Sequence, residues 1–143
     1  MTCRPRLLLA DDHLATAQLV SALLEPEFEV IAHVSDGRAL ISAADRLSPD
    51  VIVSDISMPG LDGITAASVI LHKHPDMPII FMTVHGDRHM VERGLATGAR
   101  GYVLKVVAGD DLMPAVRAAM RGERHVSPGL NFSPASRESQ NTR

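Results

Sequence analysis

Five side chains suited to phosphoryl and metal chemistry lie at or just after the ends of short apolar runs in this sequence of 143 residues. If these runs are parallel strands, their carboxyl ends meet at one edge of the sheet, where open α/β sheets bind ligands. The sequence therefore predicts three carboxylates, a hydroxyl and an ammonium close together at that edge. The five residues are Asp11, Asp12, Asp55, Thr83 and Lys105.

The three carboxylates, Asp11, Asp12 and Asp55, would repel one another at such an edge. Two like charges about 4 Å apart repel by roughly 4 kcal/mol at an effective dielectric constant near 20. The ammonium of Lys105 and a divalent cation would together balance the three negative charges. Because the available ligands are oxygens, the pattern favours a hard ion, Mg²⁺ or Mn²⁺, with water completing an octahedron.

Asp55 is the candidate nucleophile of this group because it stands at the end of the central apolar run, Val51–Val53, shortly before a Pro59-Gly60 turn. Carboxylates form aspartyl-phosphates, and phosphoryl transfer depends mainly on positioning and on nearby cations. A divalent cation, the ammonium of Lys105, the hydroxyl of Thr83 and loop N–H groups can supply both. We therefore expect Asp55 to carry a phosphoryl group that Thr83 and Lys105 contact.

The elements that must position these side chains alternate along the chain between β-rich runs and helical apolar periodicities. Strands are predicted at Leu7–Ala10, Phe28–Val34, Val51–Asp55, Pro78–Thr83 and Tyr102–Leu104. Helices are predicted at Leu14–Leu24, Arg38–Leu47, Gly63–His74, from Gly86 or Asp87 to Thr97, and at Asp111–Arg121. Asp62 and Asp110 are predicted N-caps, and Gly122 is predicted to close the last helix. This alternation indicates an α/β fold whose parallel sheet is covered on both faces.

The composition of the chain argues against several classes of protein. A net charge of −3 does not favour nucleic acid or an anionic membrane. No apolar run approaches the roughly 20 residues that span a bilayer, and no signal peptide is expected. The single cysteine, Cys3, leaves no internal disulfide and fits a cytoplasmic location. We expect one domain at residues 1–126, followed by a polar tail or linker at residues 127–143.

Taken together, the motifs resemble the receiver domains of response regulators in two-component signalling. The matching features are Asp11-Asp12 after a first strand, Asp55 followed by Met58-Pro59-Gly60, Thr83, and the run Gly101–Lys105. The resemblance covers about residues 6–125. It implies a flavodoxin-like, doubly wound fold with a five-stranded parallel sheet in the order 2-1-3-4-5 and five helices.

The resemblance also implies roles for the acidic residues. Asp55 would accept a phosphoryl group from the phosphohistidine of a sensor histidine kinase. Asp12 would bind Mg²⁺ directly, Asp11 would bind it through water, and the backbone carbonyl of Ser57 would be a further metal ligand. The protein would then be a phosphorylation-dependent signalling switch rather than an enzyme that turns over a metabolite.

The same resemblance implies how the signal leaves the site. Lys105 would pair with the phosphoryl group, Thr83 would hydrogen-bond to it, and Tyr102 would turn inward when Thr83 moves. The partner surface made by the fourth helix, the fifth strand and the fifth helix would then change. Two positions depart from the commoner pattern: Val84 replaces a small residue and Val106 replaces a proline. We expect Val84 to narrow access to the site or to restrict Tyr102.

Three alternatives use the same residues. A metal-dependent phosphohydrolase could form an aspartyl-phosphate, but Ser57 stands where a second acid/base carboxylate would be expected. A pseudo-receiver could bind partners without phosphorylation, although the full set of acidic and basic residues argues against it. The segment Gly122–Pro128 resembles the end of receiver domains that are joined to a DNA-binding helix-turn-helix, so the chain is either part of a longer regulator of transcription or a lone receiver.

The expected partners follow from these interpretations. A sensor histidine kinase is the expected phosphodonor, and a homodimer through the helices at the edge of the fifth strand is one arrangement that the resemblance allows. The chain as given carries no basic recognition helix, so this chain alone is not expected to bind nucleic acid. Binding to a membrane is not expected either.

Overall fold

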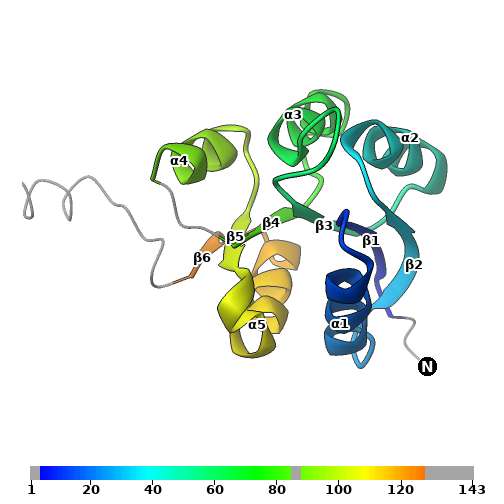
Figure 1. The fold of residues 1–143 in the computed structure, drawn as a ribbon, viewed down its shortest axis with the longest axis vertical. Coiled ribbons are helices and arrows are strands. Elements are labelled where there is room, and N and C mark those ends of the chain that lie inside the picture. Colours follow the sequence, from blue (N-terminus) through cyan, green and yellow to red (C-terminus); the bar gives the residue numbers. More distant parts are fainter. Residues whose placement is uncertain (1–3, 85–87, 128–143) are drawn as a thin grey trace, which may run out of the picture.

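The computed structural model describes residues 4–84 and 88–127, which form three layers (Figure 1). A central sheet is covered on one face by α2, α3 and α4 and on the other by α1 and α5. The strands are β1 (Arg6–Ala10), β2 (Glu29–Val34), β3 (Val51–Asp55), β4 (Ile79–Thr83), β5 (Gly101–Leu104) and β6 (His125–Val126). The helices are α1 (Leu14–Leu24), α2 (Gly37–Leu47), α3 (Gly63–Lys73), α4 (Arg88–Ala96), the short 3-10 helix η1 (Lys105–Val107) and α5 (Ala108–Met120).

The sheet is parallel throughout, and its strands follow the order β2-β1-β3-β4-β5-β6. This confirms the predicted α/β fold and the predicted order of the first five strands. The prediction of a five-stranded sheet missed β6, in which His125 pairs with Gly101 and Val126 with Tyr102. A strand of two residues leaves no alternating pattern in the sequence, and it takes its shape from pairing with β5.

Two N-caps were predicted, Asp62 and Asp110, and the structure also shows one at Asp36. Asp36 and Asp62 cap α2 and α3, each accepting a hydrogen bond from the backbone N–H three residues on, at 2.8 and 2.7 Å. The prediction for Asp62 is therefore confirmed. The prediction that Asp110 caps the last helix was wrong, because η1 runs directly into α5, which begins at Ala108 and places Asp110 in its first turn.

The end of α5 is closed as predicted by Gly122, whose φ is 82°. The N–H of Glu123 donates to the carbonyl of Ala118 at 2.9 Å, and the N–H of Gly122 donates to the carbonyl of Ala119 at 3.0 Å. This is the Schellman arrangement, which needs a residue that tolerates positive φ. The predicted starts of the fourth helix, Gly86 and Asp87, lie outside the described residues.

Alternate strand positions supply two hydrophobic clusters, one on each face of the sheet. Leu8 and Phe81 belong to the cluster beneath α2, α3 and α4, whereas Leu7 and Ile80 belong to the cluster beneath α1 and α5. Successive residues of a strand point to opposite faces, so Thr83 shares the face of Phe81. None of the helices in the described ranges is both long and apolar enough to cross a membrane.

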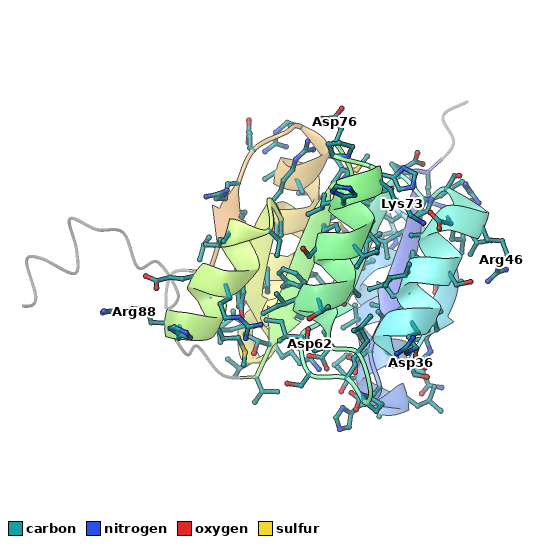
Figure 2. All side chains as sticks on the ribbon, turned by 90° about the horizontal axis from the view of Figure 1, so that it is seen from above. Asp36, Arg46, Asp62, Lys73, Asp76 and Arg88 are labelled. Carbon is teal, nitrogen blue, oxygen red and sulfur yellow. The ribbon has the colours of Figure 1, made fainter. Side chains whose placement is uncertain are left out.

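All the helices of the α2–α3–α4 layer begin at the same end of the sheet. Figure 2 looks onto this layer: Asp36, Asp62 and Arg88, at the starts of the three helices, lie toward one end. Lys73 and Asp76, at and beyond the end of α3, lie toward the other. The loops that leave the strands therefore gather at one edge, which is the edge where the candidate residues were expected.

Candidate functional site

Lys105 joins two of the predicted carboxylates at this edge. Its Nζ donates to Asp55 Oδ2 at 3.0 Å and to Asp11 Oδ2 at 3.2 Å. The side chain of Asp11 is fully buried, and those of Asp55 and Lys105 are only 7% and 14% exposed. The structure thus gathers, in a largely dry environment, three side chains that come from the ends of three different strands.

The register of the sheet explains why these ends meet. Asp55 lies beside Met82 of β4, and Thr83 lies beside Leu104 of β5, the residue before Lys105. Neighbouring parallel strands therefore finish at nearly the same level. The side chain at or just after the end of each strand therefore lies at a common edge of the sheet, as expected from the alternation of strands and helices.

The pKa values of Asp55 and Lys105 are both raised, but for different reasons. Burial raises the pKa of Asp55 above its ordinary value, and the charge of Asp11 adds to the effect against the opposing influence of Lys105. Burial works against the ammonium of Lys105, but the hydrogen bonds and charges of Asp55 and Asp11 outweigh it and raise the pKa of Lys105. A further cation would relieve the repulsion between the carboxylates.

Asp12 and His13 stand on the outer side of the buried carboxylates. The Nδ1 of His13 lies 3.1 Å from Asp12 Oδ1 and 3.7 Å from Asp11 Oδ1. The backbone N–H of His13 also donates to Asp11 Oδ1 at 2.9 Å, which fixes the Asp11 carboxylate. One potential ligand atom from each of Asp11, Asp12, His13 and Asp55 lies within 4.8 Å of the others.

This cluster fits a hard divalent cation. Oxygen ligands on opposite sides of Mg²⁺, each bonded at about 2.1 Å, are about 4.2 Å apart, so atoms within 4.8 Å of one another can share one ion after small adjustments. The donors are mainly carboxylate oxygens, which suit Mg²⁺ and Mn²⁺. The side chain of Asp12 is 27% exposed, so water can reach the same side of the cluster to complete the coordination.

A pocket of about 360 Å³ lies over the Asp55–Lys105 pair. Thr83 lines this pocket, so the hydroxyl-bearing residue of β4 faces the same space as the carboxylate and the ammonium. Val84 lies at its rim with 64% of its surface exposed. That this side chain narrows the approach to the site stays a prediction.

A second pocket of about 470 Å³ adjoins the first on the side of Asp12. Ser57 and Met90 line both pockets, and Arg93 lines only the second. Ser57 was a predicted site residue, whereas Met90 was missed. A methionine seven residues beyond the end of a strand carries no chemical signal in a sequence, so only the folded position of α4 reveals it.

The backbone around Asp55 is held by a close approach that sequence reasoning also missed. A Cβ atom on Gly63 would lie 2.1 Å from the carbonyl oxygen of Asp55, and the Gly63 N–H donates to the carbonyl of Ile56 at 2.8 Å. The hydroxyl of Ser54 donates to the same Asp55 carbonyl at 2.8 Å. A glycine at the first position of a helix is a poor helix former, and this was the available sign of a close contact.

Tyr102 is fully buried beneath α4. Its ring packs edge-on against Phe81, with the centroids 5.9 Å apart and an interplanar angle of 63°. A Cβ atom on Gly94 of α4 would lie 2.7 Å from Tyr102 Cε2, so this glycine lets the helix approach the ring. Since Thr83 lies two residues beyond Phe81 on the same face, Thr83 and Tyr102 are near neighbours under one helix.

Comparison with known proteins agrees with this geometry. A family model described as the response regulator receiver domain matches residues 7–117. The chain is 34% identical to the transcriptional regulatory protein DegU of Brevibacillus brevis over 130 residues, 90% of this chain and 55% of that protein. It is 40% identical to the transcriptional regulatory protein LiaR of Bacillus subtilis over 120 residues, 82% of this chain and 57% of that protein.

A solved structure has the same architecture over nearly the whole chain. The crystal structure of a two-component response regulator of the LuxR family from Aurantimonas sp. superposes with a TM-score of 0.87 at 27% identity, covering 98% of this chain and 99% of that one. The chain spans less than two thirds of the length of the curated relatives named above. The similarity therefore concerns the part of those relatives that forms the receiver fold.

Proposed function

This chain belongs to the family of response regulator receiver domains, and from that membership we propose that it is a phosphorylation-dependent signalling switch. Asp55 accepts a phosphoryl group from the phosphohistidine of a sensor histidine kinase in the presence of Mg²⁺ or Mn²⁺. The observation that carries the proposal is the ammonium of Lys105 placed 3.0 Å from Asp55 and 3.2 Å from Asp11 at the floor of a pocket.

In the proposed transfer, an Asp55 carboxylate oxygen forms a bond to phosphorus while the bond from phosphorus to the histidine nitrogen breaks. The leaving imidazole takes a proton. Lys105 keeps its ammonium beside the new phosphoryl oxygens, and the hydroxyl of Thr83 donates a hydrogen bond to one of them. Such fixed charges stabilise the transferred group strongly because the site is largely buried.

The metal part of the proposal rests on the donor set. Asp11, Asp12, Asp55 and the backbone carbonyl of Ser57 would hold the ion, Asp11 through water. Bound Mg²⁺ supplies positive charge to the phosphoryl oxygens. The spacing of the ligand atoms supports this assignment, as does the negative charge of Asp11, which adds to burial in raising the pKa of Asp55.

The signal is proposed to leave the site through Thr83 and Tyr102. Phosphorylation draws Thr83 toward the phosphoryl group, and the packing of Tyr102 against Phe81 and Gly94 then changes. The result is a shift between two packings of the face formed by α4, β5 and α5. The shared face of Thr83 and Tyr102 under α4 supports this route.

The proposed output of this switch is regulation of transcription, and the names of two relatives support it. DegU and LiaR are named as transcriptional regulatory proteins, and we propose that this receiver also regulates transcription, with residues 1–126 as the receiver and residues 127–143 as a tail or linker. The receiver residues themselves are not expected to bind nucleic acid. The protein is proposed to act as a switch and not as a phosphohydrolase, because Ser57 occupies the position where that enzyme would need a second acid/base carboxylate.

The proposed function is tested by labelling with a small phosphodonor. Wild-type protein incubated with radiolabelled acetyl phosphate and Mg²⁺ is expected to take up about one phosphoryl group, and Asp55→Asn none. Asp45→Asn, which changes an exposed carboxylate on α2, is the matched control and is expected to label like wild type. Equal labelling of Asp55→Asn would remove Asp55 from its role, and sustained release of phosphate over many turnovers would favour the phosphohydrolase instead.

A further inference from the structure

We propose that Met90 shields the phosphoryl group on Asp55 from water and so lengthens the lifetime of the phosphorylated state. This inference rests on the proposed function, because it concerns the loss of a phosphoryl group from Asp55. It assigns to an α4 side chain a role that neither the ionic cluster nor the Thr83–Tyr102 route supplies.

The pocket over Asp55 has two chemically different walls. His13 and Thr16, from the start of α1, provide a polar wall, whereas Val84 and Met90 provide an apolar one. α1 and α4 lie on opposite faces of the sheet, so the two walls approach the site from opposite sides (Figure 1). Water entering along the α4 side meets no hydrogen-bonding group from Val84 or Met90 beyond the weakly accepting thioether.

Met90 is placed to act as the barrier between two spaces. It lines the pocket of about 360 Å³ over Asp55 and also the adjoining pocket of about 470 Å³ beside Asp12. Its side chain is partly buried and packs against the hydrophobic cluster beneath α4. The larger pocket reaches Asp12, and the side chain of Met90 lies where this pocket adjoins the pocket over Asp55.

Hydrolysis of the phosphoryl group needs a water molecule in a defined place. The oxygen of water forms a bond to phosphorus, the bond from phosphorus to the Asp55 oxygen breaks, and the products are the Asp55 carboxylate, inorganic phosphate and a proton released to solvent. Attacking and leaving oxygens lie roughly in line, so the water must approach from the pocket side opposite Asp55. An apolar side chain at that side neither orients this water nor accepts its proton.

The shield is also connected to the switch. Met90 lies one helical turn before Gly94, and Gly94 is the position at which α4 rests on the ring of Tyr102. A change in the packing of Tyr102 would therefore move the part of α4 that carries Met90. The lifetime of the phosphoryl group and the conformation of the partner face are thus expected to be linked through one helix.

The test measures how fast the phosphoryl group is lost from Met90 variants of the full chain. Each protein is labelled with radiolabelled acetyl phosphate and Mg²⁺, the donor is removed, and the decay of protein-bound label is followed. Met90→Gln keeps the length of the side chain but adds hydrogen-bonding groups, Met90→Ala opens the wall, and Met90→Leu keeps it apolar. Leu95→Ala is the matched control, because Leu95 is a partly buried α4 residue of the same cluster that lines neither of the two pockets.

The expected decay of Met90→Gln is about fivefold faster than wild type, the size that one added hydrogen bond to the attacking water would produce. Met90→Ala is also expected to decay faster than wild type, because it opens the wall to water. Met90→Leu is expected to decay like wild type, and Leu95→Ala likewise, even if its melting temperature falls. One decay rate for all variants, or equal acceleration by Leu95→Ala, would overturn this inference while leaving the proposed function standing. Absence of label on wild type would overturn the proposed function and this inference together.

Discussion

The Nζ atom of Lys105 lies 3.0 Å from an oxygen of Asp55, although the two residues are 50 positions apart and leave the sheet from β5 and β3, with β4 between them. A second carboxylate, Asp11, lies 3.2 Å from the same ammonium. One cation thus serves two buried anions. Removal of any one of these three charges should therefore change the stability of the fold, and single substitutions can measure that change.

Removing the ammonium is expected to destabilise the fold. Lys105→Met keeps an unbranched apolar stem but leaves Asp11 and Asp55 largely buried without their counter-ion, and the free energy of unfolding should fall by about 3 kcal/mol. Urea denaturation in the absence of metal measures this change in the free energy of unfolding. Lys73→Met, which breaks an exposed pair with Asp45, is the matched control and should change stability little. In the double variant Lys105→Met/Asp55→Asn the loss should be smaller than the sum of the two single effects; a loss equal to that sum would show that the pair is not coupled.

Removing the charge of Asp55 is expected to have the opposite sign. Burial raises the pKa of Asp55, which means that the fold disfavours its charged form. Asp55→Asn should therefore stabilise the metal-free protein at neutral pH, measured by thermal or urea unfolding in the presence of a chelator. At exposed Asp45 the hydrogen bonds of Lys73 and His74 lower the pKa, so Asp45→Asn should bring no such gain. A loss of stability in Asp55→Asn would contradict the electrostatic description of the site.

Addition of Mg²⁺ is expected to stabilise wild type. A ligand that binds only the folded state adds about 2.7 kcal/mol when its free concentration is 100 times its dissociation constant. Melting curves with MgCl₂, compared with KCl at equal ionic strength, should show a rise in melting temperature that a chelator reverses. Asp12→Asn should lose most of the rise, whereas His13→Ala should keep it, because Mg²⁺ prefers oxygen ligands. Equal stabilisation by the two salts would argue against a specific metal site.

The packing of Tyr102 can be followed without adding a probe, because it is the only tyrosine of the chain and there is no tryptophan. Phosphorylation of wild type should change the tyrosine fluorescence as the ring changes its surroundings. Thr83→Val keeps the shape of the side chain without its hydroxyl, so it should still take up label while losing most of the fluorescence change. An unchanged spectrum in fully phosphorylated wild type would separate Tyr102 from the switch.

The contact between α4 and Tyr102 predicts a contrast between two helical glycines. Gly94→Ala would place a Cβ atom 2.7 Å from Tyr102 Cε2 and 3.2 Å from Phe81 Cδ2, so it should destabilise the protein by about 1–3 kcal/mol. Gly109→Ala, in α5, meets nothing within 4 Å and should leave stability unchanged or raise it by up to about 1 kcal/mol. Similar effects of both substitutions would mean that α4 does not rest closely on the ring.

The sequence could predict that the side chains at the strand ends lie close together. That prediction depends on two strong signals, the apolar runs and the polar residues that follow them. Asp55 and Lys105 needed only the rule that parallel strands end at one edge. The strand order came from the family resemblance, since periodicity alone allows other doubly wound arrangements. The position of Asp110 was misjudged because aspartate favours both a cap and the first turn of a helix, and η1 had already wound the chain.

Other features depend on packing between distant segments and left weak signals or none. Met90 matters through the place where α4 crosses the site, which no local pattern specifies. Gly63 and Gly94 each mark a close approach, but a glycine in a sequence does not say what it approaches. These contacts decide how rigidly the ionic cluster and Tyr102 are held. They are the features of the site that the fold shows and the sequence does not.

The described sheet has two edge strands, β2 with six residues and β6 with only two. The pairing of β6 occupies the outer hydrogen-bonding groups of β5, and among the described strands β2 is left as the opposite margin, with Glu29 and His33 exposed along it. Another polypeptide that joined the sheet backbone to backbone at β2 would do so far from Tyr102 and α4. The longer edge of the described sheet and the proposed relay through Tyr102 therefore lie on opposite flanks of the molecule.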